Sequence, residues 1–170
     1  MTGVPQHVTE VFPLAVAFDV VRRPVLIVAI LVSLMLVSTT PVAAQTEAGH
    51  VIGIAKNQLG DPWVWATRGP DTFDCIGLVH YSFKKAALLD RIGGRYRSIR
   101  GYKDWFANRG LASRYNGKRG DLVIWGRFQH IGIYLGDGKA ISTLTSGVAI
   151  HSVFKISVPF RTFLHVKLTR

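Results

Sequence analysis

The feature that most constrains the fold is a change in hydrophobic period close to Arg119. Before this point, apolar residues recur at spacings of three and four, as along residues 74–89, which is typical of helices with one buried face. After it, residues 121–125 and 130–135 form extended apolar runs, and Gly136-Asp137-Gly138 is a tight-turn signal. Helices followed by antiparallel strands predict an α+β domain.

The predicted elements can be placed approximately along the chain. Helices are expected over residues 51–59, 74–89 and 102–108. Strands are expected over residues 121–125, 130–135, 139–143, 148–153 and 163–168. With a single cysteine the chain has no internal disulfide, so the domain must be stabilised by its hydrophobic core.

An uncharged apolar run, VLIVAILVSLMLV, occupies residues 25–37 near the N-terminus. Arg22 and Arg23 precede it and small residues up to Ala44 follow it, which is the order of a secretory signal. The alternative is an uncleaved membrane anchor, although a bilayer span needs about 20 residues. We therefore expect a signal peptide or anchor over residues 1–44, a linker over 45–50 and one domain over 51–170. The domain would be exported to the periplasm, cell wall or exterior, or held at the membrane if the segment is not cleaved.

The charge of the chain is strongly positive, with a formal net charge of +11. Residues 1–44 hold equal numbers of acidic and basic residues, so the whole excess lies on the predicted exported part. Such a surface suits an anionic wall polymer, peptide carboxylates or a membrane surface, and the alternative is simply a solvated basic face. Export argues against nucleic acid as a partner. Neither a CxxC pair nor a His/Cys/Asp set at ligand spacing occurs, so no metal or cofactor is expected.

The single cysteine, Cys75, follows Asp74 at the predicted start of a helix. Aspartate is a good N-cap, and a thiol in the first turn lies where the helix dipole favours the thiolate. The alternative is a small buried hydrophobic residue. A cysteine peptidase also needs a histidine base and a third group that orients it. Among the six histidines, position alone favours His130 only weakly.

Two long stretches resemble signatures of the NlpC family of papain-like cell-wall peptidases. Residues 58–79, QLGDPWVWATRGPDTFDCIGLV, resemble the family's Q-x-G-x-P-Y-x-W-G-G-x-G-P-x-x-F-D-C-S-G-L-V without a gap. Residues 119–125, RGDLVIW, and 130–138, HIGIYLGDG, resemble its P-G-D-L-V-F-W and H-V-G-I-Y-L-G-N-G. The resemblance extends over about residues 51–153. It implies a papain-like fold, with N-terminal helices packed on an antiparallel sheet and the nucleophile at a helix N-terminus.

The resemblance also implies a mechanism and a substrate. Cys75 would be the nucleophile that forms a thioester, and His130 the base that takes the thiol proton. Ser142 stands at the place of the family's third group, twelve residues after His130. The family's substrates are peptidoglycan stem peptides, usually cut between D-glutamate and the diamino acid.

Substrate-binding roles are expected for Trp63, Asp74 and Ile76. Trp63 replaces the family's tyrosine and Ile76 replaces the serine after the cysteine, while Ala66 stands where the family has a glycine. The third group of the family is usually His, Asn or Gln, where this chain has a serine. His151, one strand further on, is either a recruited third group or an exposed strand residue.

Two alternatives to a peptidase stay open. The same Cys–His pair can serve an amidase or an acyltransferase, because both react through a thioester. The second alternative is a catalytically impaired binding domain associated with the wall or membrane, and the changes at polar positions favour it.

Overall fold

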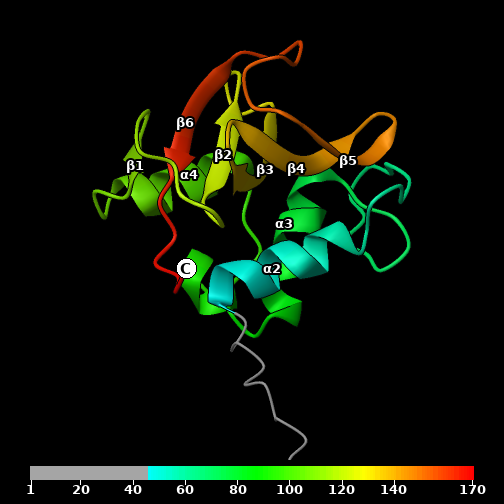
Figure 1. The fold of residues 1–170 in the computed structure, drawn as a ribbon, viewed down its shortest axis with the longest axis horizontal. Helices are drawn as coiled ribbons and strands as arrows, with labels where there is room; N and C mark the ends of the chain where they lie inside the picture. Colours follow the sequence, from blue (N-terminus) through cyan, green and yellow to red (C-terminus); the bar gives the residue numbers. More distant parts are fainter. Residues whose placement is uncertain (1–45) are drawn as a thin grey trace, which may run out of the picture. The chain divides into compact units, whose positions relative to one another are not determined.

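The protein was analysed as a computed structural model, which describes residues 46–170. The predicted signal or anchor segment, residues 1–44, lies outside the described residues. The described part consists of helices and one antiparallel sheet (Figure 1). The helical elements are α2 (Glu47–Lys56), α3 (Cys75–Lys85), the 3-10 helix η1 (Leu89–Ile92) and α4 (Ile99–Ala107). The strands are β1 (Ala112–Ser113), β2 (Leu122–Trp125), β3 (His130–Gly136), β4 (Lys139–Leu144), β5 (Gly147–Ser152) and β6 (Phe160–Leu164).

Helix α2 begins four residues before the predicted start, inside the segment that was expected to be a linker. Thr46 is its N-cap, and the side chain of Thr46 accepts a hydrogen bond from the Gly49 amide at 3.1 Å. The buried residues of α2 follow helical spacing and form one face: Ala48, Val51, Ile52 and Ala55. The prediction of a linker over 45–50 was therefore wrong from Glu47 onward.

Helix α3 carries Cys75 as its first residue. Asp74 is extended and caps the helix, because its side chain accepts a hydrogen bond from the Gly77 amide. The helix ends at Lys85 rather than Leu89, and Ala87 adopts a left-handed backbone with φ +58°. The apolar face that the sequence predicted is buried against the sheet: Leu78, Val79, Ser82 and Phe83.

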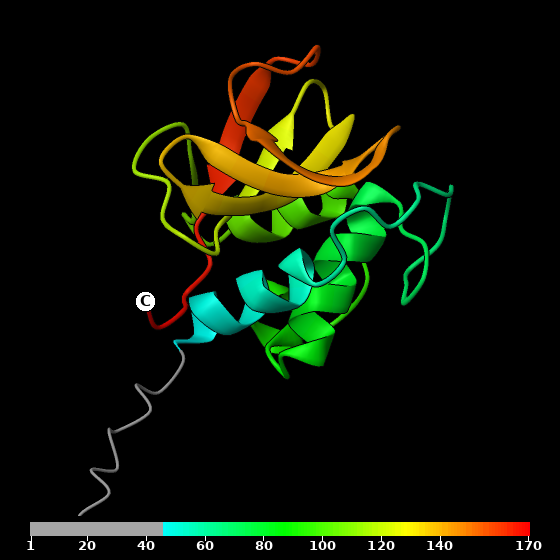
Figure 2. The same cartoon turned by 45° about the vertical axis from the view of Figure 1, so that its right-hand side comes forward.

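The sheet has the strand order β1-β6-β2-β3-β4-β5, and every neighbouring pair is antiparallel. Strands β2 to β5 follow one another as the predicted meander. β6 instead returns across the sheet to pair with β2, and its Phe160–Leu164 span starts three residues before the predicted strand. Figure 2 shows α2 and α3 stacked as one layer beneath this sheet.

Strand β2 is buried on both faces of the sheet. Leu122 and Ile124 belong to the main core between the sheet and the helices, whereas Val123 and Trp125 belong to a smaller cluster on the opposite face. This alternation follows the period of two that a strand imposes on its side chains. The second face therefore has its own packed layer, and Trp125 is fully buried within it.

Asp121, just before β2, fastens the end of the chain to the sheet. Its buried carboxylate accepts hydrogen bonds from His165 Nδ1 at 2.8 Å and from Arg170 Nη2 at 2.7 Å, and also from the Lys118 and Val166 amides. His165 Nε2 lies 2.8 Å from Ser113 Oγ. The same hydroxyl also donates to the Tyr115 carbonyl and accepts from the Tyr115 amide. These side chains hold the C-terminal segment and do not form a second catalytic triad.

Within residues 46–170, none of the helices is long and apolar enough to cross a membrane.

Candidate active site

Cys75 and His130 line the same cleft, which has a volume of about 820 Å³. Cys75 is half-buried at the N-terminus of α3, and His130 is the first residue of β3. The thiol lies beside β3, because the backbone of Ile131 forms a hydrogen bond with it. Among the hydrogen bonds of the described residues, none joins Cys75 directly to His130. The two groups thus line one cleft without a direct hydrogen bond between them.

A loop positions the nucleophile before the helix begins. The Asp74 amide donates to the Thr67 carbonyl at 3.1 Å, and the Val64 amide donates to the Phe73 carbonyl at 3.1 Å. Gly77 allows this loop to lie against α3, because a Cβ at Gly77 would run into the Thr67 carbonyl. The glycine of the D-C-x-G sequence is therefore needed for close packing, not for an unusual backbone angle.

Ala66, which stands where the resembled signature has glycine, has φ +61° in this loop. This left-handed conformation costs a non-glycine residue roughly 1 kcal/mol. The loop thus makes a left-handed turn at a residue that is not glycine.

Burial governs the protonation of Cys75 and His130. It raises the pKa of the Cys75 thiol, and the hydrogen bond from Ile131 only partly offsets this. Burial, together with the charge of His151, lowers the pKa of His130 to about 4. At neutral pH the pair therefore consists of a thiol and a neutral imidazole. The effect expected of the helix dipole, which favours the thiolate, is thus opposed by the burial of the thiol.

Ser142 lies behind His130, on β4. Its Oγ is 2.7 Å from His130 Nε2 and 2.7 Å from His151 Nε2, so it bridges two imidazoles. His151 Nδ1 contacts the Ser152 carbonyl oxygen at 3.1 Å. His151 is therefore not simply an exposed strand residue: it lies on β5, next to the strand that carries Ser142.

Trp125 supports both imidazole rings. Its ring centroid lies 5.2 Å from that of His130 and 5.4 Å from that of His151. The indole is itself fixed, because Nε1 donates to the Val153 carbonyl at 2.7 Å. The packed outer face of the sheet thus restricts how the two histidines can turn.

The three predicted substrate-binding residues all line the cleft of Cys75 and His130. Trp63 is 41% exposed and also lines a neighbouring cleft of about 470 Å³, which shares Gln129 and His130 with the first. Asp74 is nearly buried, and its carboxylate is engaged as the helix cap. Ile76 presents an apolar surface beside the nucleophile. Cys75 therefore lines one hollow, and His130 lies where that hollow meets the second.

Sequence reasoning did not assign the arginines of the cleft. Arg68, Arg100 and Arg127 line it, and none forms an ion pair within the described part of the chain. Arg68 stacks 3.8 Å from the centroid of Tyr96, and Arg100 stacks 4.5 Å from that of Phe128. The other basic residues near Arg100 do not share this role, since Arg91, for example, pairs with Glu47. In the sequence, only the excess of positive charge and a cluster of arginines that includes Arg100 indicated a basic surface.

No group of three His, Cys, Asp or Glu residues within 46–170 is placed to hold a metal ion.

A cysteine at a helix N-terminus, with a histidine on the adjoining antiparallel sheet, is the arrangement of a papain-like α+β domain. The family model described as "NlpC/P60 family" matches residues 60–166, and the chain belongs to this family.

Among curated proteins, the chain is similar to "Probable endopeptidase p60" of Listeria grayi. The two are 35% identical over 102 residues, which are 58% of this chain and 18% of that protein. The chain therefore spans less than a fifth of the length of this relative.

Two solved structures from Mycobacterium tuberculosis are also similar. The peptidoglycan hydrolase RipB is 30% identical, with a TM-score of 0.52 over 73% of this chain and 64% of that one. RipD, described as a non-catalytic NlpC/p60 domain protein, is 24% identical, with a TM-score of 0.51 over 74% of this chain and 98% of that one. The second likeness shows the fold alone.

Proposed function

We propose that this chain is an exported cysteine endopeptidase that hydrolyses peptidoglycan stem peptides. The observation that carries the proposal is the placement of Cys75 and His130 around one cleft in a member of the NlpC/P60 family. Relatives named as a probable endopeptidase and a peptidoglycan hydrolase support the same reaction class. The apolar segment at residues 25–37 supports export.

In the proposed reaction, Cys75 Sγ attacks a peptide carbonyl while His130 takes the thiol proton. The tetrahedral oxyanion forms near the first turn of α3, where unpaired backbone amides can stabilise it. The carbon–nitrogen bond then breaks, and His130 gives its proton to the leaving amine. Water, activated by His130, hydrolyses the thioester, which releases the carboxylic acid and restores the thiol.

Because Cys75 and His130 are both neutral at rest, the thiolate must form during the reaction. Because burial raises the pKa of Cys75 and lowers that of His130, little ion pair exists at rest. Proton transfer therefore accompanies attack, as in general-base catalysis.

The charge of the cleft supports an acidic peptide as the substrate. Arg68, Arg100 and Arg127 lack carboxylate partners in the described structure, and stem peptides carry free carboxylates. We place the cleaved bond between D-glutamate and the diamino acid, on the resemblance of the two signatures. An anionic wall polymer or a membrane surface is the further partner that the net charge of +11 suits.

The test is mass analysis of peptidoglycan fragments digested by the full chain. We expect new amino termini on the diamino acid, and none after Cys75→Ala. Failure of the wild-type chain to release any new terminus would contradict the proposal.

A binding module without turnover is the second candidate, favoured by the raised pKa of Cys75. It predicts that the chain sediments with peptidoglycan but cuts nothing.

A further inference from the structure

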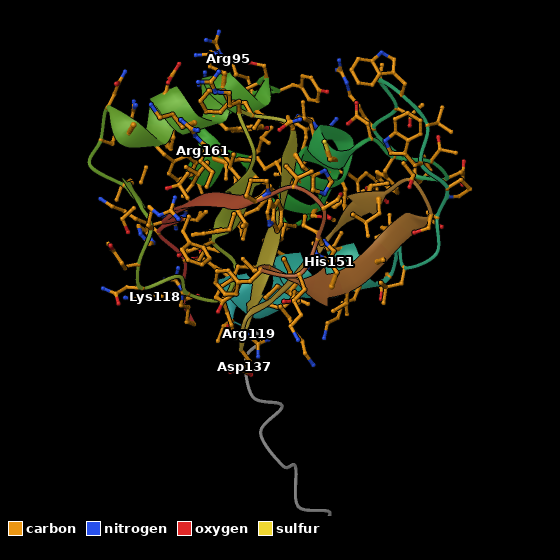
Figure 3. The ribbon with its side chains drawn as sticks, turned by 90° about the horizontal axis from the view of Figure 1, so that it is seen from above. Arg95, Lys118, Arg119, Asp137, His151 and Arg161 are labelled. Atoms are coloured by element: carbon orange, nitrogen blue, oxygen red, sulfur yellow. The ribbon has the colours of Figure 1, made fainter. Side chains whose placement is uncertain are left out.

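The strongest unexplained feature is the chain of hydrogen bonds behind His130. It runs from His130 Nε2 to Ser142 Oγ, on to His151 Nε2, and from His151 Nδ1 to the Ser152 carbonyl. The two contacts of Ser142 are both 2.7 Å long. Figure 3 views the molecule from above and labels His151 on β5, on the face of the sheet away from α2 and α3.

Counting donors along this chain fixes which nitrogen carries each proton. A carbonyl oxygen only accepts, so His151 Nδ1 must be the donor to Ser152. In neutral His151 the proton is thereby placed on Nδ1, and Nε2 must accept, which makes the Ser142 hydroxyl its donor. The oxygen of Ser142 is then left to accept from His130 Nε2–H.

The consequence for His130 is a defined tautomer. With its proton on Nε2, the free lone pair is on Nδ1, the nitrogen that forms no side-chain hydrogen bond within the described part of the chain. Nδ1 is thus the atom available to take the thiol proton of Cys75. A serine alone could not enforce this, because its hydroxyl can donate to His130 as readily as accept from it.

We propose that His151 is a positioning residue, which acts through Ser142 to hold His130 in the Nε2–H tautomer. His151 and Ser142 together do the work of the single orienting side chain that the resembled signature has at position 142. Trp125 packs against both rings and keeps them in place. The catalytic meaning of this inference rests on the proposed peptidase function, but the tautomer itself can be measured without any substrate.

The environment of His151 includes few other charges. The ring centroids of Trp125 and His130 lie 5.4 Å and 6.4 Å from that of His151, and the strand pairing places Ala140 opposite. Lys139 and Lys155, with Asp137, line the shallow hollow at its outer edge. Burial lowers the pKa of His151, which keeps this ring neutral and able to accept from Ser142 at neutral pH.

The test compares two substitutions of His151 by ¹⁵N NMR of the imidazole of His130 at pH 7. His151→Phe keeps an aromatic ring but removes the acceptor, whereas His151→Gln offers a side-chain oxygen in its place. In the wild type we expect His130 to be almost wholly Nε2–H. In His151→Phe we expect a mixture with Nδ1–H, and in His151→Gln a return toward the wild-type spectrum.

Kinetics then separate positioning from a general loss of structure. His151→Phe should lower kcat about tenfold and leave KM unchanged, because positioning of the base acts on the transition state. Against a Ser142→Ala background the same substitution should have no further effect, since the connection is already cut. His80→Gln, on α3, is the matched control and should change neither the tautomer nor kcat.

A His130 proton on Nδ1 in the wild type, or a tautomer unchanged in His151→Phe, would overturn the inference. If His151→Phe does not fold, the wild-type tautomer and the effect of Ser142→Ala on it decide the question. Absence of peptidase activity would contradict the proposed function while leaving the NMR result to stand or fall independently.

Discussion

At the scale of single residues, the side chains of Cys75 and His130 are largely buried, and the sequence does not reveal this burial. The motif predicted Cys75 at a helix start, and the structure has it there. The thiol and imidazole are nevertheless neutral at rest, because both are withdrawn from water. The pH behaviour of the protein should follow from this burial.

His130 should make the folded state sensitive to mild acid. Its pKa is about 4 in the folded chain and about 6.5 when unfolded, so the unfolded state binds more protons between these values. The contribution of neutral His130 is complete above pH 6.5 and is lost as the pH falls toward 4. Between pH 7 and pH 4.5 we expect the free energy of unfolding to fall by about 2 kcal/mol from this residue. Urea titrations at both pH values measure it.

His130→Gln provides the comparison for this pH effect. Glutamine does not titrate, so the variant should lose about 2 kcal/mol less than the wild type over the same interval. Equal losses in the two proteins would show that His130 is not the group responsible.

Ala66 gives a second prediction at this scale. Since its φ is +61°, Ala66→Gly should relieve strain and raise the free energy of unfolding by about 0.5–1 kcal/mol. Ala55→Gly, in the regular buried turn of α2, should instead lower it by at least about 1 kcal/mol. Denaturant midpoints measure both, and a loss of stability in Ala66→Gly would contradict the strained turn.

At the scale of elements, helix α3 and the loop before it form one unit. The loop reaches Asp74 through backbone hydrogen bonds, and Gly77 lets the Thr67 carbonyl approach the helix. The position of the nucleophile therefore depends on a contact between two segments and not on the helix alone.

Gly77→Ala should break this contact. A Cβ there meets backbone rather than a flexible side chain, so we expect a loss of about 2–4 kcal/mol in the free energy of unfolding. Gly101→Ala is a closely matched control, because Gly101 is also the third residue of its helix and also donates to the cap side chain. Space at Gly101 is less restricted, so that variant should be neutral or more stable. Similar effects of the two substitutions on thermal unfolding would argue against the close contact.

The elements also show where sequence reasoning succeeds and fails. The start of α3 was predictable, since the cap at Asp74 and the apolar spacing after it are local signals. The start of α2 was missed because Thr46 and Glu47 precede the apolar pattern. β1 is only two residues long and exists through its pairing with β6, so no local pattern marks it. Pairing between strands far apart in the chain cannot be predicted from local sequence patterns.

The same reason explains which parts of the site could be predicted. Cys75, His130, Trp63 and Ile76 fall within continuous signatures, and the structure places all four in one cleft. His151 meets Ser142 only through the register of β4 and β5, which no spacing along the chain reveals.

At the scale of the whole molecule, part of the excess positive charge lies on arginines that line the cleft. Tyr96 and Phe128 hold the guanidinium groups of Arg68 and Arg100 at the cleft wall without neutralising them. A substrate with free carboxylates would find partners there at no cost of breaking existing ion pairs.

Arg100→Gln should therefore raise KM for an acidic stem peptide by about fivefold, with kcat little changed. The effect should shrink as salt is added, because an exposed ion pair is screened. Arg95→Gln removes the same charge outside the cleft and should leave KM unchanged. An equal rise of KM in both variants would show that only the net charge matters.

The most direct test of the central claim is the mass of the protein itself during turnover. The full chain is mixed with a stem peptide, quenched in acid within the first turnovers, and digested for peptide mass analysis. We predict an adduct on Cys75 equal to the acyl half of the substrate, labile to hydroxylamine as a thioester is. Release of products without any adduct on Cys75, at an undiminished rate in Cys75→Ala, would contradict the account.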